Sequence, residues 1–288
     1  GEILMDALSK LMRVVRSNQW VKNLIVLGAP IAAGTFTERD TLIRAMISMT
    51  LFILASSAVY VFNDLQDRSA DQYHPLKSLR PVSSGDVPPQ IAGLIGLTCF
   101  LASLVGAAFL NLSVMYMLLT YFGVNVAYSI ALKHVPYAEL CLVASGFTIR
   151  AATGGLATDT HISFSYIAVV TLSSLCLISC KRFSECIAYV DHDFRPVLKK
   201  YSQRSLFLVI SFSIVGSLLT YFIWVVQNQT SNTYSLLSWV MCAVGFLRFS
   251  NLAKLGKCEN PTLILFTDKL LNISVTCWAL TYIGSVYG

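Results

Sequence analysis

The sequence predicts an all-α polytopic membrane protein with about nine transmembrane helices. Hydrophobic residues make up 55% of the 288 residues, and charged residues make up only 12%. The mean hydropathy of +0.65 is far above that of an ordinary soluble domain. These values exclude a soluble globular enzyme. They favour one membrane domain over 1–288 rather than the two that length alone would suggest.

Nine apolar segments have lengths suited to crossing a bilayer as helices, although the first of them is short. They cover residues 20–34, 41–62, 90–110, 113–131, 137–156, 163–180, 205–227, 234–249 and 262–287. No cleavable signal peptide is expected, because the basic start leads into a span without a small-residue cleavage site.

The loops between these spans alternate between basic and nearly uncharged. The basic side collects Lys10, Arg13, Arg16, Arg68, Lys77, Arg80, Lys133, Lys181, Arg182, Arg195, Lys199, Lys200, Arg204, Lys254 and Lys257. The positive-inside rule makes that side cytoplasmic and places the N-terminus inside. We therefore expect a multi-pass protein of the cell inner (plasma) membrane. Its cytoplasmic cap loops would cover about 64–88, 132–136, 181–204 and 250–261.

The eight cysteines lie mostly inside or beside the spans and contain no Cys-x-x-Cys pair. They predict small buried apolar side chains rather than a disulfide framework or a zinc site.

Four oxygen-bearing side chains follow the second span, at Asn63, Asp64, Asp67 and Asp71. The three aspartates stand at i, i+3 and i+7, which is one stripe of a helix. Like charges so close together repel unless a cation lies among them, and oxygen ligands suit Mg²⁺. Mg²⁺ held by few carboxylates is usually completed by water and substrate phosphates. The alternative, a solvated acidic face, is disfavoured because these residues continue a membrane-length helix, where charge is costly.

This pattern, with Lys77, Arg80-Pro81 and Ser84-Gly85 after it, resembles the first signature of the UbiA superfamily of intramembrane prenyltransferases. The resemblance implies nine helices around a central cavity capped by cytoplasmic loops. Aromatic prenyltransferases of that superfamily carry a second aspartate-rich motif after the sixth span. Here that place reads Lys181-Arg182-Phe183-Ser184-Glu185, and only a short Asp191-x-Asp193 follows.

The sequence is more similar to the polyprenyl-phosphate phosphoribosyltransferase branch, the decaprenylphosphoryl-5-phosphoribose synthases. The matching stretches are Gln19-Trp20-Val21-Lys22-Asn23, His74-Pro75-x-Lys77-x-x-Arg80-Pro81, Tyr128-Ser129 with Leu132-Lys133-His134, Arg150-Ala151 with Gly154-Gly155, Lys181-Arg182-x-x-Glu185, Arg195-Pro196-Val197-Leu198 with Tyr201-Ser202, and Leu247-Arg248-Phe249. The resemblance implies Mg²⁺-dependent transfer of 5-phosphoribose from phosphoribosyl diphosphate (PRPP) to a polyprenyl (decaprenyl) phosphate. Diphosphate is released, and the product leads toward decaprenylphosphoryl arabinose for cell-wall arabinan. The partners expected are these substrates and the bilayer, with no nucleic acid; a homo-oligomer is compatible with the sequence.

Under this hypothesis Asp64, Asp67 and Asp71, assisted by Asn63, hold Mg²⁺ on the donor diphosphate and stabilise its departure. Lys181 and Glu185 complete the catalytic candidates, and Glu185 is the nearest base if one is required. The substrate-binding candidates are Lys22, Asn63, Lys77, Arg80, Lys133, Arg150, Arg182, Arg195, Tyr201 and Arg248.

Several of these residues have a second interpretation. Lys133 would alternatively be a snorkelling anchor, and Arg248 either snorkels or binds phosphate. Lys181, Arg182 and Glu185 would bind the ribose 5-phosphate or the acceptor phosphate, with an internal Arg182–Glu185 ion pair as the structural alternative. Arg150 lies inside a span, which favours a site role.

Arg195 and Tyr201 would form part of a lid that closes over the site on the cytoplasmic side. Lys199, Lys200 and Arg204 are instead typical of a membrane-surface patch.

Two rival functions stay open at this point. One is an aromatic or quinone-pathway prenyltransferase of the same fold, with Asp191 and Asp193 as second metal motif. The other is a non-catalytic lipid-binding or transport protein.

Overall fold

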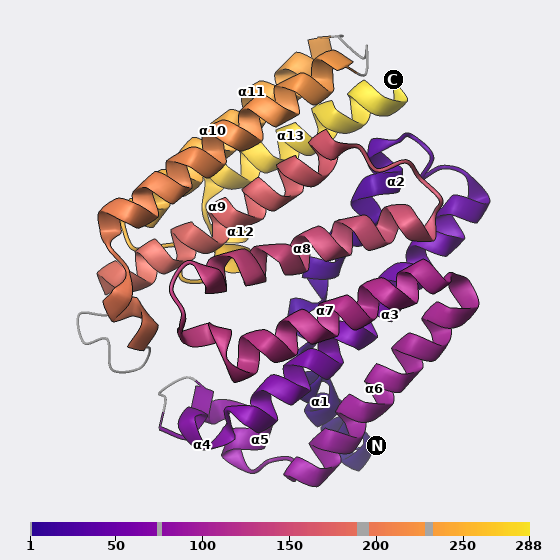
Figure 1. Cartoon of the computed structure of the whole chain (residues 1–288), viewed down its shortest axis with the longest axis vertical. Coiled ribbons are helices and arrows are strands. Elements are labelled where there is room, and N and C mark those ends of the chain that lie inside the picture. Colours follow the sequence, from indigo (N-terminus) through magenta and orange to yellow (C-terminus); the bar gives the residue numbers. More distant parts are fainter. Residues whose placement is uncertain (1, 74–76, 189–195, 228–232) are drawn as a thin grey trace. The chain divides into compact units, whose positions relative to one another are not determined.

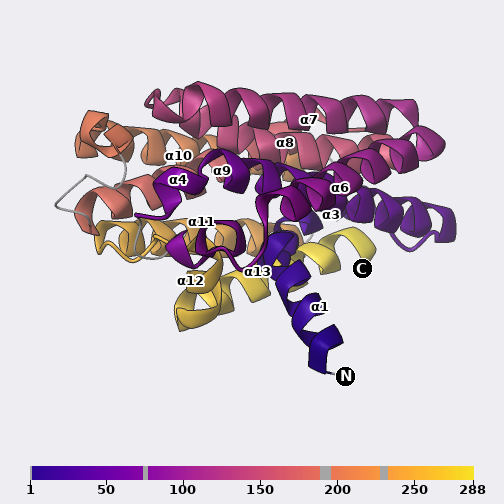
Figure 2. The ribbon, with the colours of Figure 1, turned by 90° about the horizontal axis from the view of Figure 1, so that it is seen from below.

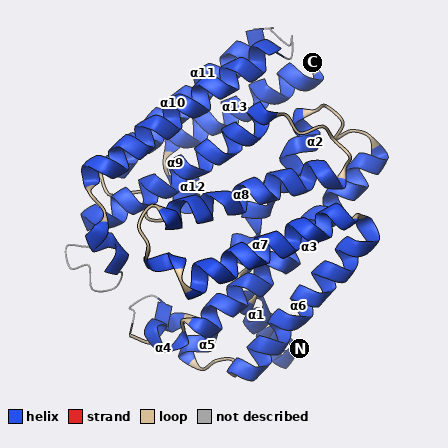
Figure 3. Ribbon diagram, in the orientation of Figure 1, coloured by secondary structure: helices blue, strands red, loops and turns tan. Residues whose placement is uncertain are grey.

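The structure, a computed structural model, describes residues 2–73, 77–188, 196–227 and 233–288. Within these residues every regular element is a helix (Figure 3). In chain order the elements are α1 (Glu2–Val14), the 3-10 segment η1 (Ser17–Leu27), α2 (Gly28–Ala32), α3 (Arg39–Gln66), α4 (Arg68–Asp71), η2 (Lys77–Leu79), α5 (Pro81–Ser84), α6 (Pro89–Leu110), α7 (Leu112–Ile130), η3 (Leu132–His134), α8 (Ala138–Ala157), α9 (Phe164–Ala188), η5 (Pro196–Lys200), α10 (Gln203–Gln227), α11 (Thr233–Lys254), α12 (Pro261–Thr267) and α13 (Lys269–Tyr287).

The chain forms two compact units. Unit 1 comprises Gly1–Pro30, Phe36–Ala131 and Ile149–Thr160, and unit 2 comprises Ile31–Thr35, Leu132–Thr148 and His161–Gly288. The long helix α8 contributes its first half to unit 2 and its second half to unit 1. The expectation of one domain over 1–288 stays a prediction.

Of the described residues, eight helices are long and apolar enough to cross a membrane: α3, α6, α7, α8, α9, α10, α11 and α13. They coincide with eight of the nine expected spans. The chain is a multi-pass membrane protein. Its N-terminal helix α1 carries exposed apolar side chains and runs out from the rest of unit 1 (Figure 2).

The first expected span, 20–34, is not one continuous α-helix. The segment is a 3-10 helix, η1, followed by the short α2. Pro30 has no N–H to donate to the carbonyl of Val26, so an α-helical hydrogen bond at this position is unavailable. That carbonyl instead lies so close to Gly154 of α8 that a Cβ built on Gly154 would stand 1.7 Å from it. Only glycine allows this approach.

The last expected span, 262–287, is split into α12 and α13 at Asp268. The extended backbone of Asp268 (φ −89°, ψ 112°) ends α12, and its side chain accepts a hydrogen bond from the N–H of Leu271 at 2.9 Å. This contact caps the first turn of α13. The two helices therefore lie at an angle to each other (Figure 2).

Packing within each unit follows the pattern of membrane helices, with small residues inside and large apolar residues outside. In unit 1, α3 packs against α6, and in unit 2 α9 packs against α10 and α11 against α13 (Figure 1). Ser48 of α3 and Ser213 of α10 are fully buried, whereas Phe109 is 89% exposed. Because the exposed side chains of the long helices are largely apolar, lipid rather than water is their natural surrounding.

Candidate functional site

The expected aspartate stripe lies where α3 ends in unit 1, but it is not one continuous helix. α3 ends at Gln66, Asp67 adopts φ −91° and ψ 1°, and the four-residue α4 follows. Asp64 and Asp71 are each only 2% exposed, and Asp67 is half-buried. The break allows the last turn of α3 and α4 to present their carboxylates to a common partner.

That partner is Arg80, the residue that precedes α5. Its Nη1 donates to Asp64 Oδ1 at 3.0 Å and to Asp71 Oδ2 at 2.5 Å. Lys77 adds an ion pair to Asp71 Oδ1 at 3.6 Å. The predicted closeness of Lys77 and Arg80 to the acidic stripe is thus a direct contact, and α5 packs against α1, α4 and α3 (Figure 1).

A further cation, Arg16, comes from the junction between α1 and η1. It holds Asp64 with two nitrogens, Nε to Oδ2 at 3.1 Å and Nη2 to Oδ1, and its guanidinium lies 5.3 Å from the centre of the Tyr60 ring. The backbone of Arg16 is left-handed (φ 50°, ψ 55°), which is uncommon for a residue other than glycine and is a form of strain found at functional sites. We call Asp64, Asp71, Arg16, Arg80 and Lys77 the aspartate cluster.

The donor atoms around this cluster fit a Mg²⁺ ion that substrate phosphates complete. Asp64 and Asp71 supply carboxylate oxygens, and the adjacent Asn63 has a buried Oδ1 that finds no hydrogen-bond partner among the described residues. An orphaned oxygen beside two carboxylates is the hard donor set that Mg²⁺ prefers, with one or two carboxylates and the rest from water and phosphate. The described residues contain no preformed group of three His, Cys, Asp or Glu ligands.

Arg150, expected to have a site role, is buried in unit 1 and binds two neutral side chains. Its Nε donates to Asn23 Oδ1 at 2.9 Å and its Nη2 to the Tyr121 hydroxyl at 2.8 Å. The guanidinium also lies over the rings of Phe52 and Tyr121, at 5.1 and 4.7 Å from their centres. Asn23 in turn donates to Ser56 of α3. Arg150 therefore ties α8, η1, α7 and α3 together.

A second group of charges lies in unit 2, where α9 continues as a helix to Ala188, beyond the expected end of its span at 180. Arg182 donates through Nε to Glu139 Oε1 at 2.7 Å and through Nη1 to Glu185 Oε2 at 2.5 Å. The alternative contact expected from sequence, an internal Arg182–Glu185 ion pair, is present. Lys181 Nζ lies 3.9 Å from Glu185 Oε1.

Tyr201 completes this group from the end of η5. Its hydroxyl donates to Glu139 Oε1 at 3.0 Å and accepts the backbone N–H of Tyr137 at 3.1 Å. Burial first, and then the negative charge of Glu139, raise the pKa of the Tyr201 hydroxyl, so it remains a donor. Tyr201 is only 9% exposed, and its side chain belongs to the interior of unit 2. We call Glu139, Glu185, Arg182, Lys181 and Tyr201 the glutamate cluster.

The remaining expected residues are Arg248, Lys22, Lys133 and Arg195. Arg248 forms a two-pronged pair with Asp268, Nε to Oδ1 at 3.0 Å and Nη2 to Oδ2 at 2.6 Å. Lys22 lies in η1 and Lys133 in η3, each half-buried. Arg195, like Asp191 and Asp193 of the rival metal motif, lies outside the described residues.

Three participants were missed by the sequence interpretation. Glu139 had a detectable signal, since a carboxylate within the expected span 137–156 is itself unusual. Arg16 was counted only among the basic residues that set the topology, and Tyr121 was not among the candidate residues. No local spacing links Arg16 to Asp64, which is 48 residues away.

The profile of the UbiA prenyltransferase family matches residues 24–266 of this chain. A decaprenyl-phosphate phosphoribosyltransferase of Mycolicibacterium smegmatis is 31% identical over 98% of this chain and 94% of its own length. The protein of that name from Mycobacterium tuberculosis is 30% identical over 94% of this chain and 92% of its own. The solved structure of a UbiA homolog from Archaeoglobus fulgidus bound to DMAPP and Mg²⁺ has a TM-score of 0.75 at 16% identity, covering 96% of this chain and 99% of that chain.

Proposed function

Because the chain belongs to the UbiA prenyltransferase family, a family of transferases, we propose that it transfers 5-phosphoribose from PRPP to a polyprenyl phosphate and releases diphosphate. The acceptor would be decaprenyl phosphate, as in the names of the relatives, and the product would serve arabinan synthesis. The reaction would take place on the cytoplasmic side of the inner membrane, which the basic loops favour.

The aspartate cluster is the observation that carries this proposal. It combines two buried carboxylates with three cations that remain partly exposed, and the buried amide oxygen of Asn63 lies beside it. The side chains of Arg16, Arg80 and Lys77 are 23%, 26% and 39% exposed. A diphosphate needs both kinds of group, because metal ligands and arginine or lysine side chains share its negative charge.

In this proposal Asn63, Asp64 and Asp71 would hold Mg²⁺, with Asp67 beside them. The ion would neutralise charge on the diphosphate and so improve it as a leaving group. Arg16 and Arg80 bind the carboxylates in the structure, and they would turn toward phosphate oxygens as substrate arrives. Arginine suits that exchange, since its planar fork matches a carboxylate and a phosphate equally well.

The acceptor phosphate needs little activation. A phosphate monoester is largely ionised at neutral pH, so one of its oxygens attacks the anomeric carbon directly. A carbon–oxygen bond forms there while the bond to the diphosphate oxygen breaks, and the diphosphate leaves with the electron pair. A single displacement inverts the α configuration of the donor and gives a β-linked product. Positioning and electrostatic stabilisation would supply most of the catalysis.

Within the glutamate cluster Lys181 is the candidate that would contact a phosphate. Its side chain is 34% exposed, whereas Arg182 is 5% exposed and already holds two carboxylates. Arg182 would therefore act as a positioning residue that orients the turn carrying Lys181. Glu185 would be the base if the acceptor required one.

The decisive test is a transfer assay with purified protein, Mg²⁺, labelled PRPP and decaprenyl phosphate. We expect label in the lipid extract, dependent on Mg²⁺ and abolished by Asp64→Ala. Asp40→Asn is a matched control on the same helix α3, since the Asp40 side chain is 82% exposed. It should leave the rate unchanged.

Two outcomes would contradict the proposal. Absence of transfer by folded protein, together with prenylation of an aromatic acid by a polyprenyl diphosphate, would establish the aromatic prenyltransferase instead. Lipid binding without turnover, unaffected by Asp64→Ala, would establish a non-catalytic protein.

A further inference from the structure

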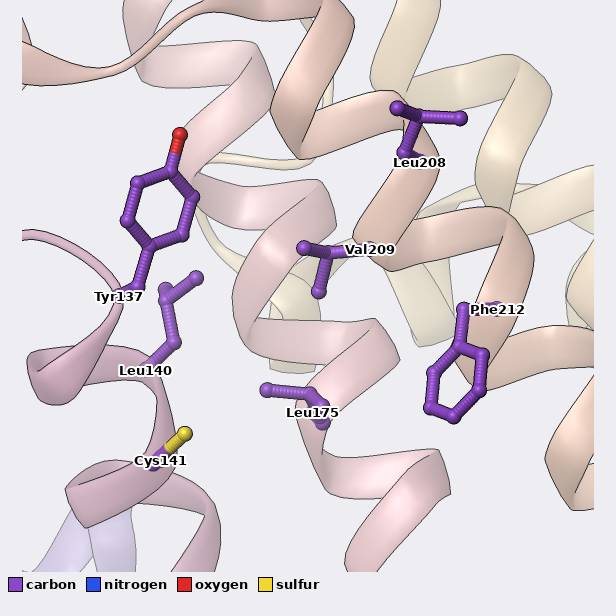
Figure 4. Close-up of a pocket in the computed structure, with 7 residues that line it drawn as sticks. All are labelled: Tyr137, Leu140, Cys141, Leu175, Leu208, Val209 and Phe212. Carbon is purple, nitrogen blue, oxygen red and sulfur yellow. The ribbon is translucent and has the colours of Figure 1, made fainter.

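Unit 2 contains an apolar groove of about 370 Å³ that has no part in the reaction as described so far (Figure 4). Three helices line it: Leu140 and Cys141 come from α8, Leu175 from α9, and Leu208, Val209 and Phe212 from α10, with Tyr137 at the start of α8. The side chains of Leu208 and Phe212 are 60% and 68% exposed. A groove with this lining excludes polar ligands and suits a hydrocarbon chain.

One end of the groove is joined to the glutamate cluster by Tyr137. Its backbone N–H donates to the hydroxyl of Tyr201, which donates to Glu139, the residue next to Leu140 in α8. The Tyr137 ring packs edge-on against Tyr201 at 5.1 Å. Tyr137 also has a left-handed backbone (φ 63°), which is strained for an aromatic residue. These contacts hold an aromatic ring at the boundary between the groove and the charged residues.

The same end of the groove carries positive charge. On α10, Arg204 precedes Leu208 by four residues and Phe212 by eight, so the three share one stripe of the helix. Arg204 and Lys200 are exposed. Lys200 Nζ donates to the carbonyl of His134, which ties η5 to η3 and the loop that leads into Tyr137. Cations above an apolar groove complement a lipid with one anionic head group.

We propose that this groove holds the part of the polyprenyl phosphate acceptor's hydrocarbon chain nearest the phosphate, with the phosphate itself at the Arg204 end. The assignment rests on the proposed function for the identity of the lipid. A groove of this size, walled by three helices, has room for a short stretch of a single hydrocarbon chain. Its Tyr137 end is linked through Tyr201 to the glutamate cluster, where Lys181 is the candidate phosphate contact. Both features favour a single-chain phosphate lipid over a two-chain phospholipid.

Cys141 provides a native probe because it is exposed in the groove. In detergent-solubilised protein, polyprenyl phosphate should slow alkylation of Cys141 by N-ethylmaleimide, as measured by peptide mass spectrometry. The slowing should be about twofold when the free lipid concentration equals its Kd, and should grow with concentration. Alkylation of Cys99, which lies in unit 1, should be unaffected and serves as internal control.

The head-group contact is tested with Arg204→Gln and two lipids. Protection of Cys141 by polyprenyl phosphate should need about fivefold more lipid in this variant, whereas protection by uncharged polyprenol should be unchanged. Protection by phosphatidylglycerol at the same concentrations as polyprenyl phosphate would overturn the assignment and identify a site for bilayer phospholipid. Absence of protection by every lipid would overturn the groove as a lipid site.

Kinetics separate this inference from the proposed function. Leu208→Trp should fill the groove and raise the KM for polyprenyl phosphate about tenfold, with the KM for PRPP unchanged. Leu219→Trp on the same helix, two turns beyond Phe212 and 58% exposed, is the matched control and should behave as wild type. Normal transfer with an unchanged lipid KM in Leu208→Trp would refute the groove and leave the function standing. Protection of Cys141 without any transfer would refute the function and leave a binding groove.

Discussion

In both the aspartate cluster and the glutamate cluster, cations surround two carboxylates. The two clusters differ in how far the cations are exposed to solvent. In the aspartate cluster the carboxylates are buried and the cations Arg16, Arg80 and Lys77 remain partly open. In the glutamate cluster both partners are buried: the side chain of the central cation, Arg182, is 5% exposed, and that of Glu139 is completely buried. A partly exposed cation keeps its contact with water when it leaves its carboxylate for a ligand, whereas a buried cation has no water to replace the carboxylate. This difference supports the proposal that the first cluster binds ligand, and that Arg182 in the second has mainly a structural role.

The largest effect expected from this difference is on stability. Arg182→Ala leaves Glu139 buried without its cation, and such a loss costs about 3–5 kcal/mol. Thermal unfolding of the purified protein should show it directly. Adding Glu139→Gln to Arg182→Ala should recover part of the loss, because the buried charge is then removed too. A variant that unfolds at the wild-type temperature would show that the cluster is not structural.

The second-largest effect is expected on the rate of the reaction, with little change in the stability of the fold. Asp71→Asn removes one of the two buried carboxylates of the aspartate cluster and should lower kcat/KM for PRPP about 100-fold. Its partners Arg80 and Lys77 are partly exposed and regain water, so the unfolding temperature should fall less than in Arg182→Ala. The transfer assay at several Mg²⁺ concentrations measures this. Unchanged kinetics would remove Asp71 from the site.

A smaller effect is expected from Arg16→Lys, which keeps the charge but loses the two-pronged contact and the stacking on Tyr60. Lysine binds phosphate as a point charge, so the KM for PRPP should rise about fivefold to tenfold. The KM for the lipid should stay constant. An equal rise in both values would indicate a general disturbance of unit 1 instead of a donor contact.

The smallest effect is expected at the Arg248–Asp268 pair, which has a similar two-pronged geometry in a more exposed place. The hydrogen bonds from Arg248, and then the N–H of Leu271, lower the pKa of Asp268 to about 2. A depressed pKa means that the ionised carboxylate stabilises the fold above its unfolded pKa of about 3.9, and that this stabilisation is lost as the pH falls toward 2. Asp268→Asn should therefore lower the unfolding temperature by fewer degrees than Arg182→Ala at pH 7, and the difference from wild type should shrink below pH 4. A constant difference from pH 7 to pH 3 would contradict the assignment.

Several features of this protein follow from the sequence alone. Apolar segments of membrane length predicted eight of the long helices, and the family match and relatives confirm the resemblance drawn from the motif around Asp64. The expected closeness of Arg80 to the aspartates was also readable, because Arg80 follows Asp71 by only 9 positions in the chain. These properties depend on composition and on neighbours in the chain, and both are visible in a sequence.

Only the tertiary structure decided which charges meet across helices. Arg16 reaches Asp64 over 48 residues, and Arg182 reaches Glu139 over 43. The close approach of Val26 to Gly154 of α8 is likewise a contact that no local pattern encodes. Such contacts depend on how helices rotate and cross when they pack, and the periodicity of one helix leaves that rotation undetermined. The sequence alone therefore determined which chemical groups are present, and packing determined which of them are bound to one another and which remain open to a ligand.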